Sequence, residues 1–323
     1  MKKLLMGLLG LIITSSAVAW EPTKIVNVIV PFAPGSGNEI SFRIAATVLE
    51  QEHNVKFIVQ NIPGADGIVG MNVLAEKPTD GQWIGVPSCQ NTFVDSEIMY
   101  SEITKFKPMD FVFVSNLAKS PLAFVAHSSS SVNTPADLMR EIKADKRPMF
   151  FAVGSSVHKL AYEYLVDKVN PANTQGKMIN YKSPGLAAQD VAGGHIEFGI
   201  VSVTTAKALV ETGKIKIIGI AGEHTVREFA NSPLMNRSVP GLNVYACFGI
   251  VLPPGTDASI QQWFSDAFVS ALRSSQVKQQ FNDNLLVVDE RALGSTAMKT
   301  DILALKKQWG NYTLRVHSKE KSN

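Results

Sequence analysis

The sequence predicts an α/β fold in which mainly parallel sheets are covered by helices and the chain is divided into two lobes. Segments with a strand pattern alternate with segments with a helical pattern along nearly the whole chain. After removal of an N-terminal leader about 304 residues remain, more than one hydrophobic core usually supports. Proline- and glycine-rich loops join the first two strands to their helices, where free helix N–H groups suit an anion.

The first 19 residues are typical of a secretory signal peptide that is removed after Ala19. Lys2 and Lys3 give a positive start, positions 4–13 are apolar, and positions 17–19 have the small residues of a cleavage site. The apolar run is too short for a comfortable transmembrane span, and no cysteine at the cleavage point indicates a lipid anchor. We therefore expect the mature chain to be soluble and exported.

Charge and residue content argue against several partners. Loss of Lys2 and Lys3 lowers the formal net charge by two, from +3 to +1, and no dense basic block predicts binding of nucleic acid. The six histidines are scattered and lack metal-ligand spacing, so neither a metal nor another cofactor is expected. Cys89 and Cys247 could pair in an oxidising compartment, but their apolar, strand-like surroundings favour two buried free thiols.

The first strand-to-helix loop is the most informative segment. A strand over 24–30 runs into a loop at 31–39 and then into a helix with apolar residues at spacing four from Ile40. Gly35 and Gly37 allow the backbone to approach a ligand closely. About thirty residues later the pattern repeats, with a strand at 55–59, a loop at 61–67 and a helix from Ile68. Two such loops in one sheet can face the same crevice.

The remaining elements follow in order. Thr134 is expected to cap a helix, and Gly193 and Gly213 to end two later ones. Positions 318–323 are expected to be disordered. The further predicted strands cover 81–87, 111–117, 122–127, 149–153, 178–181, 196–201, 215–221 and 248–252, and the further helices begin at 134 or cover 158–169, 184–192, 204–212, 257–274 and 296–312.

Taken together, the motifs resemble those of the substrate-binding proteins of tripartite tricarboxylate transporters, the Bug family. The family's first loop usually reads P-F-x-P-G-G-G-x-D, and positions 31–39 read P-F-A-P-G-S-G-N-E. Its second loop usually reads N-R-P-G-A-G-G, and positions 61–67 read N-I-P-G-A-D-G. Further matches lie at 78–81, 154–156 with His158, 181–182, 193–197 and 253–256.

This resemblance implies a two-lobed, type II-like periplasmic binding fold with two chain crossings between the lobes. It places lobe 1 at about 20–121 plus 246–323 and lobe 2 at about 122–245, with hinges expected near Pro121–Leu122 and Tyr245–Ala246. It also implies a monomeric, non-enzymatic protein that captures a small organic acid or amino acid and passes it to a membrane permease of the tripartite type.

Candidate ligand-binding residues come from the two loops, from the 154–156 loop expected in lobe 2, and from strand ends. By the resemblance, the first two loops hold one carboxylate through backbone N–H groups and lobe 2 covers the other end of the ligand. The candidates are Phe32, Gly35, Ser36, Gly37, Asn38, Glu39, Gly64, Ala65, Asp66, Ser88, Ser155, Ser156, His158 and Ser202, with Gln90 as a weaker one.

Four positions depart from the family pattern. Ile62 replaces the usual arginine, Glu39 an aspartate, and Ser202 stands where an aspartate is often found. Asp66 replaces a glycine, and a carboxylate there would disfavour a dicarboxylate ligand or instead meet an ammonium group.

Other interpretations remain open at this point. Glu39 and Asp66 could act only as helix-dipole partners, and Ser36 and Asn38 only as N-caps. An exported hydrolase could use Ser155 with His158, although no G-x-S-x-G motif is present. A sensor that reports to a membrane kinase would share the same fold and pocket, and a structural envelope protein would need neither glycine loop.

Overall fold

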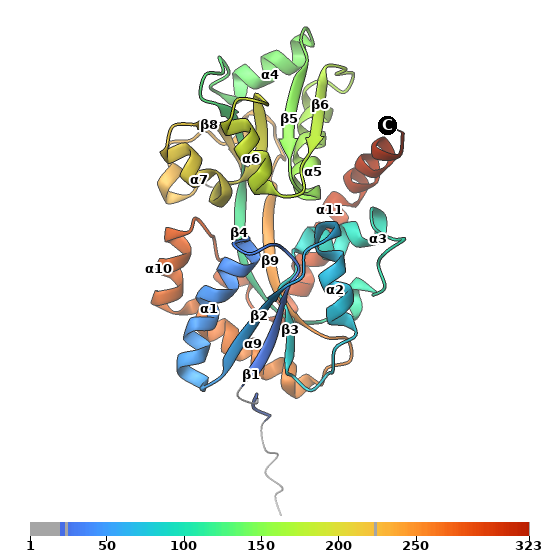
Figure 1. Cartoon of the computed structure of the whole chain (residues 1–323), viewed down its shortest axis with the longest axis vertical. Helices are drawn as coiled ribbons and strands as arrows, with labels where there is room; N and C mark the ends of the chain where they lie inside the picture. The colour runs from blue at the N-terminus through green and yellow to red at the C-terminus, as the bar shows by residue number, and fades with distance from the viewer. Residues whose placement is uncertain (1–19, 23–24, 223–224, 323) are drawn as a thin grey trace, which may run out of the picture.

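The computed structural model describes residues 20–22, 25–222 and 225–322, with side chains described as far as Ser318. The predicted signal peptide therefore lies outside the described residues. The described part contains a nine-stranded sheet in the order β2-β1-β3-β9-β4-β7-β5-β6, with β8 paired to β4. Figure 1 shows the two halves of this sheet one above the other, with helices on both faces.

The first half of the sheet carries the two glycine-rich loops. Its outer ladders, β1 with β2 and β1 with β3, are parallel, whereas β9 pairs antiparallel with β3 and β4. Its strands are β1 (Ile25–Val30), β2 (Lys56–Asn61), β3 (Trp83–Gly85) and β9 (Tyr245–Leu252), and its helices are α1 (Gly37–His53), α2 (Ile68–Ala75), α3 (Ser96–Ile98), α9 (Ala258–Arg273) and α10 (Ser275–Asp283).

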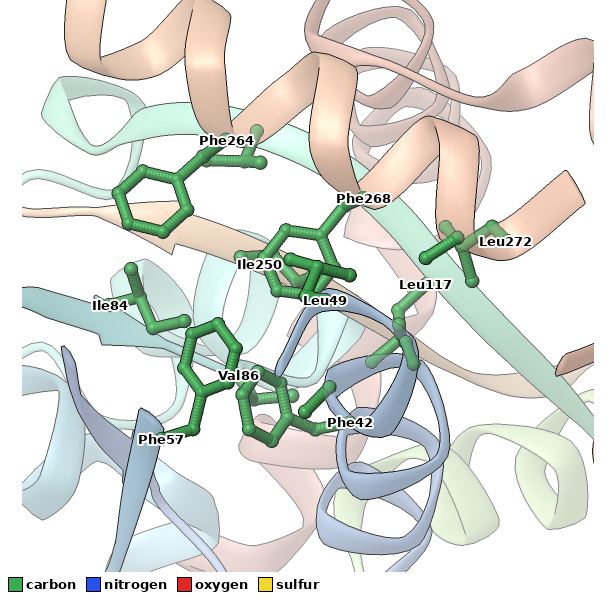
Figure 2. Packing of buried hydrophobic residues seen from close by; sticks show 14 of the residues in the cluster. Phe42, Leu49, Phe57, Ile84, Val86, Leu117, Ile250, Phe264, Phe268 and Leu272 are labelled. Atoms are coloured by element: carbon green, nitrogen blue, oxygen red, sulfur yellow. The ribbon is translucent and has the colours of Figure 1, made fainter. Parts of the chain in front are cut away.

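Aromatic residues from three elements fill the core of this half (Figure 2). Phe42 of α1 meets Phe57 of β2 edge to face, with ring centroids 5.3 Å apart. Phe264 and Phe268 of α9 lie on the opposite side of the same cluster. Because Phe42, Phe264 and Phe268 are fully buried, this packing fixes α1, and with it the first loop, on the sheet.

The second half is built in the same way around β5. This strand pairs parallel with β6 and β7, while β7 and β8 pair antiparallel with β4. Its strands are β5 (Met149–Val153), β6 (Gly176–Asn180), β7 (Phe198–Ser202) and β8 (Ile215–Ala221), and its helices are α4 (Pro135–Ala144), α5 (Ser156–Val169), α6 (Pro184–Ala192), α7 (Val203–Glu211) and α8 (Met235–Ser238).

One long strand, β4 (Val112–His127), crosses between the halves where the sequence predicts two separate strands. Residues up to Pro121 pair with β9, and Pro121 is opposite Tyr245. From Leu122 onward the strand pairs with β7 and β8. Leu122 itself is opposite Ser202 of β7 and Ala221 of β8. Since proline has no N–H to donate, Pro121 is a suitable place for the ladder to change partners without ending the strand.

The C-terminal helix, α11 (Ser295–Ser322), is longer than predicted. The expectation of a disordered 318–323 tail is wrong as far as Ser322, because residues 311–322 contain neither proline nor glycine to end the helix. The C-terminal half of α11 packs on α5, where Trp309 meets Tyr164 with ring centroids 5.5 Å apart.

The expectation of two free thiols is also wrong, because Cys89 and Cys247 form a disulfide. Ser88 and Phe248, their neighbours in the chain, face each other as an isolated β-bridge. This pairing brings the two cysteine Cα atoms to 5.4 Å, within the usual range for a disulfide. The two cysteines are 158 positions apart in the chain, so no local sequence pattern indicated that they pair.

Candidate functional site

The first loop connects β1 to α1 and is held by Glu39. The Gly35 amide donates to Glu39 Oε2 at 3.0 Å, and Arg43 Nε donates to Oε1 at 2.7 Å. Burial acts to raise the pKa of the Glu39 carboxyl, but these hydrogen bonds outweigh it and lower the pKa. Ser36 is the N-cap of α1 and accepts from the Glu39 amide at 3.4 Å. The capping interpretation of Ser36 and Glu39 therefore accounts for the contacts that they make.

The second loop lies directly beside the first, as the shared sheet predicts. Asn61, at the end of β2, donates from Nδ2 to the Phe32 carbonyl at 3.0 Å and to Glu39 Oε2 at 3.2 Å. Phe32 also covers Gly67, because a Cβ on that glycine would lie 3.2 Å from the end of its ring. Both loops thus occupy one edge of the sheet, at the carboxyl ends of β1 and β2.

The backbone of the second loop is unusual. Four consecutive residues have positive φ angles: Gly64 at 144°, Ala65 at 45°, Asp66 at 53° and Gly67 at 96°. For Ala65 and Asp66 this left-handed conformation costs on the order of 1–3 kcal/mol each, and such strain is often found at functional sites. Within the described residues, the amides of Ala65 and Asp66 have no hydrogen-bond acceptor.

The first loop offers a similar pair of donors. Gly37 and Asn38 are the first residues of α1, and helix geometry gives their amides no acceptor within the helix. No other described group accepts from them. Asn38 itself is buried and donates from its side chain to the Val86 carbonyl at 2.9 Å. Each loop therefore has two adjacent amides that can bind an anion, and the loops touch through Asn61.

A third loop, between β5 and α5, contacts the second one. The Ser156 amide, in the first turn of α5, donates to Asp66 Oδ2 at 3.0 Å. Tyr100 donates its hydroxyl to the same oxygen at 3.0 Å. Burial raises the pKa of the Asp66 carboxyl, while these hydrogen bonds and the charge of Lys159 act in the opposite direction. Asp66 therefore links the two halves of the sheet.

Next to it is a buried carboxylate that the sequence reasoning missed. Asp95 accepts from the Ser156 hydroxyl, from Gln90 Nε2 at 2.7 Å and from the Thr313 hydroxyl at 3.0 Å. It is fully buried, and this desolvation raises its pKa to about 7. The only local signal was an acid that directly follows the apolar Phe93 and Val94, and Thr313 in α11 provided none.

Polar atoms without partners lie beside this acid. Residues 91–95 form a single wide π-helical turn, a feature often found at functional sites. Gln90 Oε1, Asn91 Nδ2 and Thr92 Oγ1 are buried and lack a hydrogen-bond partner in the described structure. Buried polar atoms usually bind protein or water, so these three atoms are exceptions among the buried groups of the described residues.

His158 and Ser155 do not form a catalytic pair. His158 is buried, and desolvation lowers its pKa to about 3, so its ring is neutral at physiological pH. The Gly154 amide donates to its Nδ1 at 3.4 Å. The Ser155 hydroxyl neither caps α5 nor bonds to the His158 ring among the described contacts. A nucleophile with an activating base is therefore not assembled here.

Two predicted residues make their described hydrogen bonds within their own segments and not to the three loops. Ser88 is buried and donates to Asn91 Oδ1 at 2.8 Å. Ser202 is the N-cap of α7 and accepts from the Thr205 amide at 3.2 Å. A cavity of about 440 Å³ lies elsewhere, between α5 and α11, lined by Glu163, Asp167 and Tyr312 among others.

The described residues offer no sign of a metal centre or a membrane span. They contain no cluster of three or more His, Cys, Asp and Glu side chains suited to a metal ion. Each helix among them is too short or too polar to cross a bilayer.

The fold and these loops define a periplasmic-binding-protein architecture with anion-type loops at one sheet edge. The family model described as "Tripartite tricarboxylate transporter family receptor" matches residues 41–296. The chain belongs to this family of solute-binding receptors, which confirms the resemblance drawn from the loop motifs.

Individual relatives agree with this assignment. BugT of Bordetella pertussis is 24% identical over 287 residues, which cover 86% of this chain and 87% of that protein. The structure of the periplasmic binding protein BugD has a TM-score of 0.80 at 20% identity and covers 92% of this chain and 98% of its own. MatC from Rhodopseudomonas palustris with bound malate has a TM-score of 0.79 at 19% identity, covering 91% and 100%. An R. palustris protein with adipate has a TM-score of 0.82 at 20% identity, covering 92% and 98%.

Proposed function

We propose that this chain is a periplasmic receptor that captures a small carboxylate-bearing metabolite and delivers it to a tripartite tricarboxylate-type permease. The observation that carries the proposal is the pair of adjacent loops, whose amides at Gly37, Asn38, Ala65 and Asp66 have no acceptor among the described residues. Solved relatives with adipate and with malate support a carboxylate as the ligand class.

The ligand is held between two lobes, residues 20–121 plus 246–323 and residues 122–245. The change of strand partners at Pro121, opposite Tyr245, supports a hinge at this point. A ligand that touches both lobes stabilises the closed form because the open form lacks half of the contacts. The hydrogen bond from the Ser156 amide to Asp66 across the halves supports a closed form in which the two lobes touch.

The chain acts by binding and not by catalysis. Two observations support this part of the proposal. His158 is buried and neutral, and its ring accepts from the Gly154 amide instead of the Ser155 hydroxyl. The signal peptide predicted at residues 1–19 supports export of the chain. The receptor is a monomer when it transfers the ligand to the permease.

A thermal-shift screen tests the proposed function. Purified mature protein is melted with aliphatic monocarboxylates and dicarboxylates of two to eight carbons, and with the matching primary amides as uncharged controls. Binding to the folded state alone raises the melting temperature, so at least one carboxylate should raise it while its amide does not. Native mass spectrometry of freshly purified protein should show the same class of bound acid. If every acid and its amide leave the melting temperature unchanged and no acid is carried through purification, the proposal is wrong.

A further inference from the structure

We propose that Asp66 makes this chain select ligands with one carboxylate over matched dicarboxylates, because its own carboxylate occupies the N-terminal end of α5 in the closed form. This inference rests on the proposed capture of a carboxylate by the first two loops. It concerns the other end of the ligand, which meets the β5–α5 loop when the halves close.

The N-terminus of α5 is capped from the opposite half of the molecule. In α1, α4 and α7 the N-cap side chain accepts a hydrogen bond from its own helix. In α5 the N-cap Ser155 makes no such bond, and Asp66 accepts from the Ser156 amide instead. The helix dipole and the free amides that would attract a ligand carboxylate are therefore already matched by a carboxylate of the chain.

A ligand would not readily displace this carboxylate. Asp66 is tethered to the second loop, so it competes as an intramolecular group at an effective concentration in the millimolar range. Its left-handed backbone, with φ of 53°, and the hydrogen bond from Tyr100 fix its direction. A free dicarboxylate would have to replace both the Ser156 and the Tyr100 contacts to gain the same position.

The acids around Ser156 act in the same direction. Its amide donates to Asp66 and its hydroxyl to Asp95, so two acids share one residue. Lys159, three positions further along α5, is a positive charge that acts on Asp66. A second ligand carboxylate would meet the Asp66 carboxylate in a poorly solvated place where like charges repel strongly. A methyl, hydroxyl or ammonium end avoids that repulsion, which is selection by exclusion of the wrong ligand.

Calorimetric titration of the mature protein with matched acid pairs tests this inference. The pairs are hexanoate with adipate and butyrate with succinate, and the measured quantity is the ratio of the dicarboxylate Kd to the monocarboxylate Kd. The wild type should give a ratio above one for whichever pair binds. Asp66→Gly and Asp66→Asn should each lower that ratio at least tenfold, because the α5 end then lacks the resident charge. Glycine and asparagine both tolerate the left-handed backbone, so both variants should fold.

Asp266→Asn is the matched control. Asp266 is an exposed acid on α9, and its loss changes the net charge equally without touching the three loops. It should leave the ratio within twofold of the wild type. A ratio that stays within twofold of the wild type in both Asp66 variants overturns the inference while leaving the proposed function intact. If none of the four acids binds to the wild type or to either variant, the proposed function fails and the inference fails with it.

Discussion

Asp95 is a carboxyl group enclosed by protein at the point where the residues after β3, the start of α5 and the end of α11 meet. Its hydrogen bonds from Gln90, Ser156 and Thr313 do not offset the cost of removing it from water, and its pKa rises to about 7 from an ordinary value of 3.8. The folded protein therefore retains a proton on Asp95 at pH values where the unfolded chain has lost it. Stability should accordingly fall as the pH rises from about 4 to about 7.

Replacing Asp95 by asparagine tests this at the level of the residue. The difference in unfolding free energy between Asp95→Asn and the wild type should shift in favour of the variant between pH 5 and pH 8, by on the order of 2–3 kcal/mol. Urea denaturation at pH 5, 6, 7 and 8 measures it. Asp137→Asn is the control, because hydrogen bonds from Arg140 and Thr134 lower the pKa of Asp137 to about 2, and its contribution changes only below pH 4. A difference that does not depend on pH would contradict the assignment.

Individual residues of the site could be predicted from the sequence only in part. The motif of the second loop drew attention to Asp66, but its partner Ser156 lies 90 positions later, and packing alone brings them together. Glu39 was recognised at a helix start because capping is a local interaction. Asp95 and Thr313, separated by 218 positions, have no local pattern that indicates their contact.

Elements were predictable where the signal is local. Alternating apolar patterns and glycine-rich loops predicted β1, α1, β5 and α6 to within a few residues, since each is set by its own periodicity and caps. The continuity of β4 was missed because it depends on pairing with three different strands, β7, β8 and β9. The start of α5 was placed too late by two residues, because its cap comes from Asp66 and not from the adjacent sequence.

The disulfide joins β9 to the segment after β3 and gives an element-scale prediction. It closes a loop of 158 residues, so its loss frees a large part of the unfolded chain. Reduction should lower the unfolding free energy by about 2–5 kcal/mol. Urea denaturation with and without dithiothreitol measures the change, and the double variant Cys89→Ala with Cys247→Ala should be insensitive to the reductant. Rapid alkylation of both cysteines in unreduced, denatured protein would contradict the disulfide.

At the scale of the whole molecule, α11 connects the two halves in addition to β4 and β9. Figure 1 shows it running from the first half past α5 of the second. Trp309 is 3% exposed and belongs to the core of the second half, and Tyr312 donates to Asp167 of α5 at 3.0 Å. Any opening of the halves must therefore bend or slide this helix. The sequence predicted only two chain crossings between the lobes and did not predict this third connection.

Trp309→Ala should be strongly destabilising, because it leaves a large cavity between α11 and α5. The expected loss in unfolding free energy is about 3–5 kcal/mol, measured by urea denaturation. Leu314→Ala on the same helix is the matched control, since its side chain is 50% exposed and its loss should cost within about 0.5 kcal/mol. Equal effects of the two substitutions would show that α11 is not anchored on the second half.

The central claim is that the amides of the two adjacent loops bind a carboxylate. Amide nuclear magnetic resonance of ¹⁵N-labelled mature protein, titrated with the acid that gives the largest thermal shift, tests it most directly. The resonances of Gly37, Asn38, Ala65 and Asp66 should move with saturation at the Kd found by calorimetry, while amides at the far end of α9 stay unchanged. Saturable binding that leaves all four loop amides in place would contradict the account.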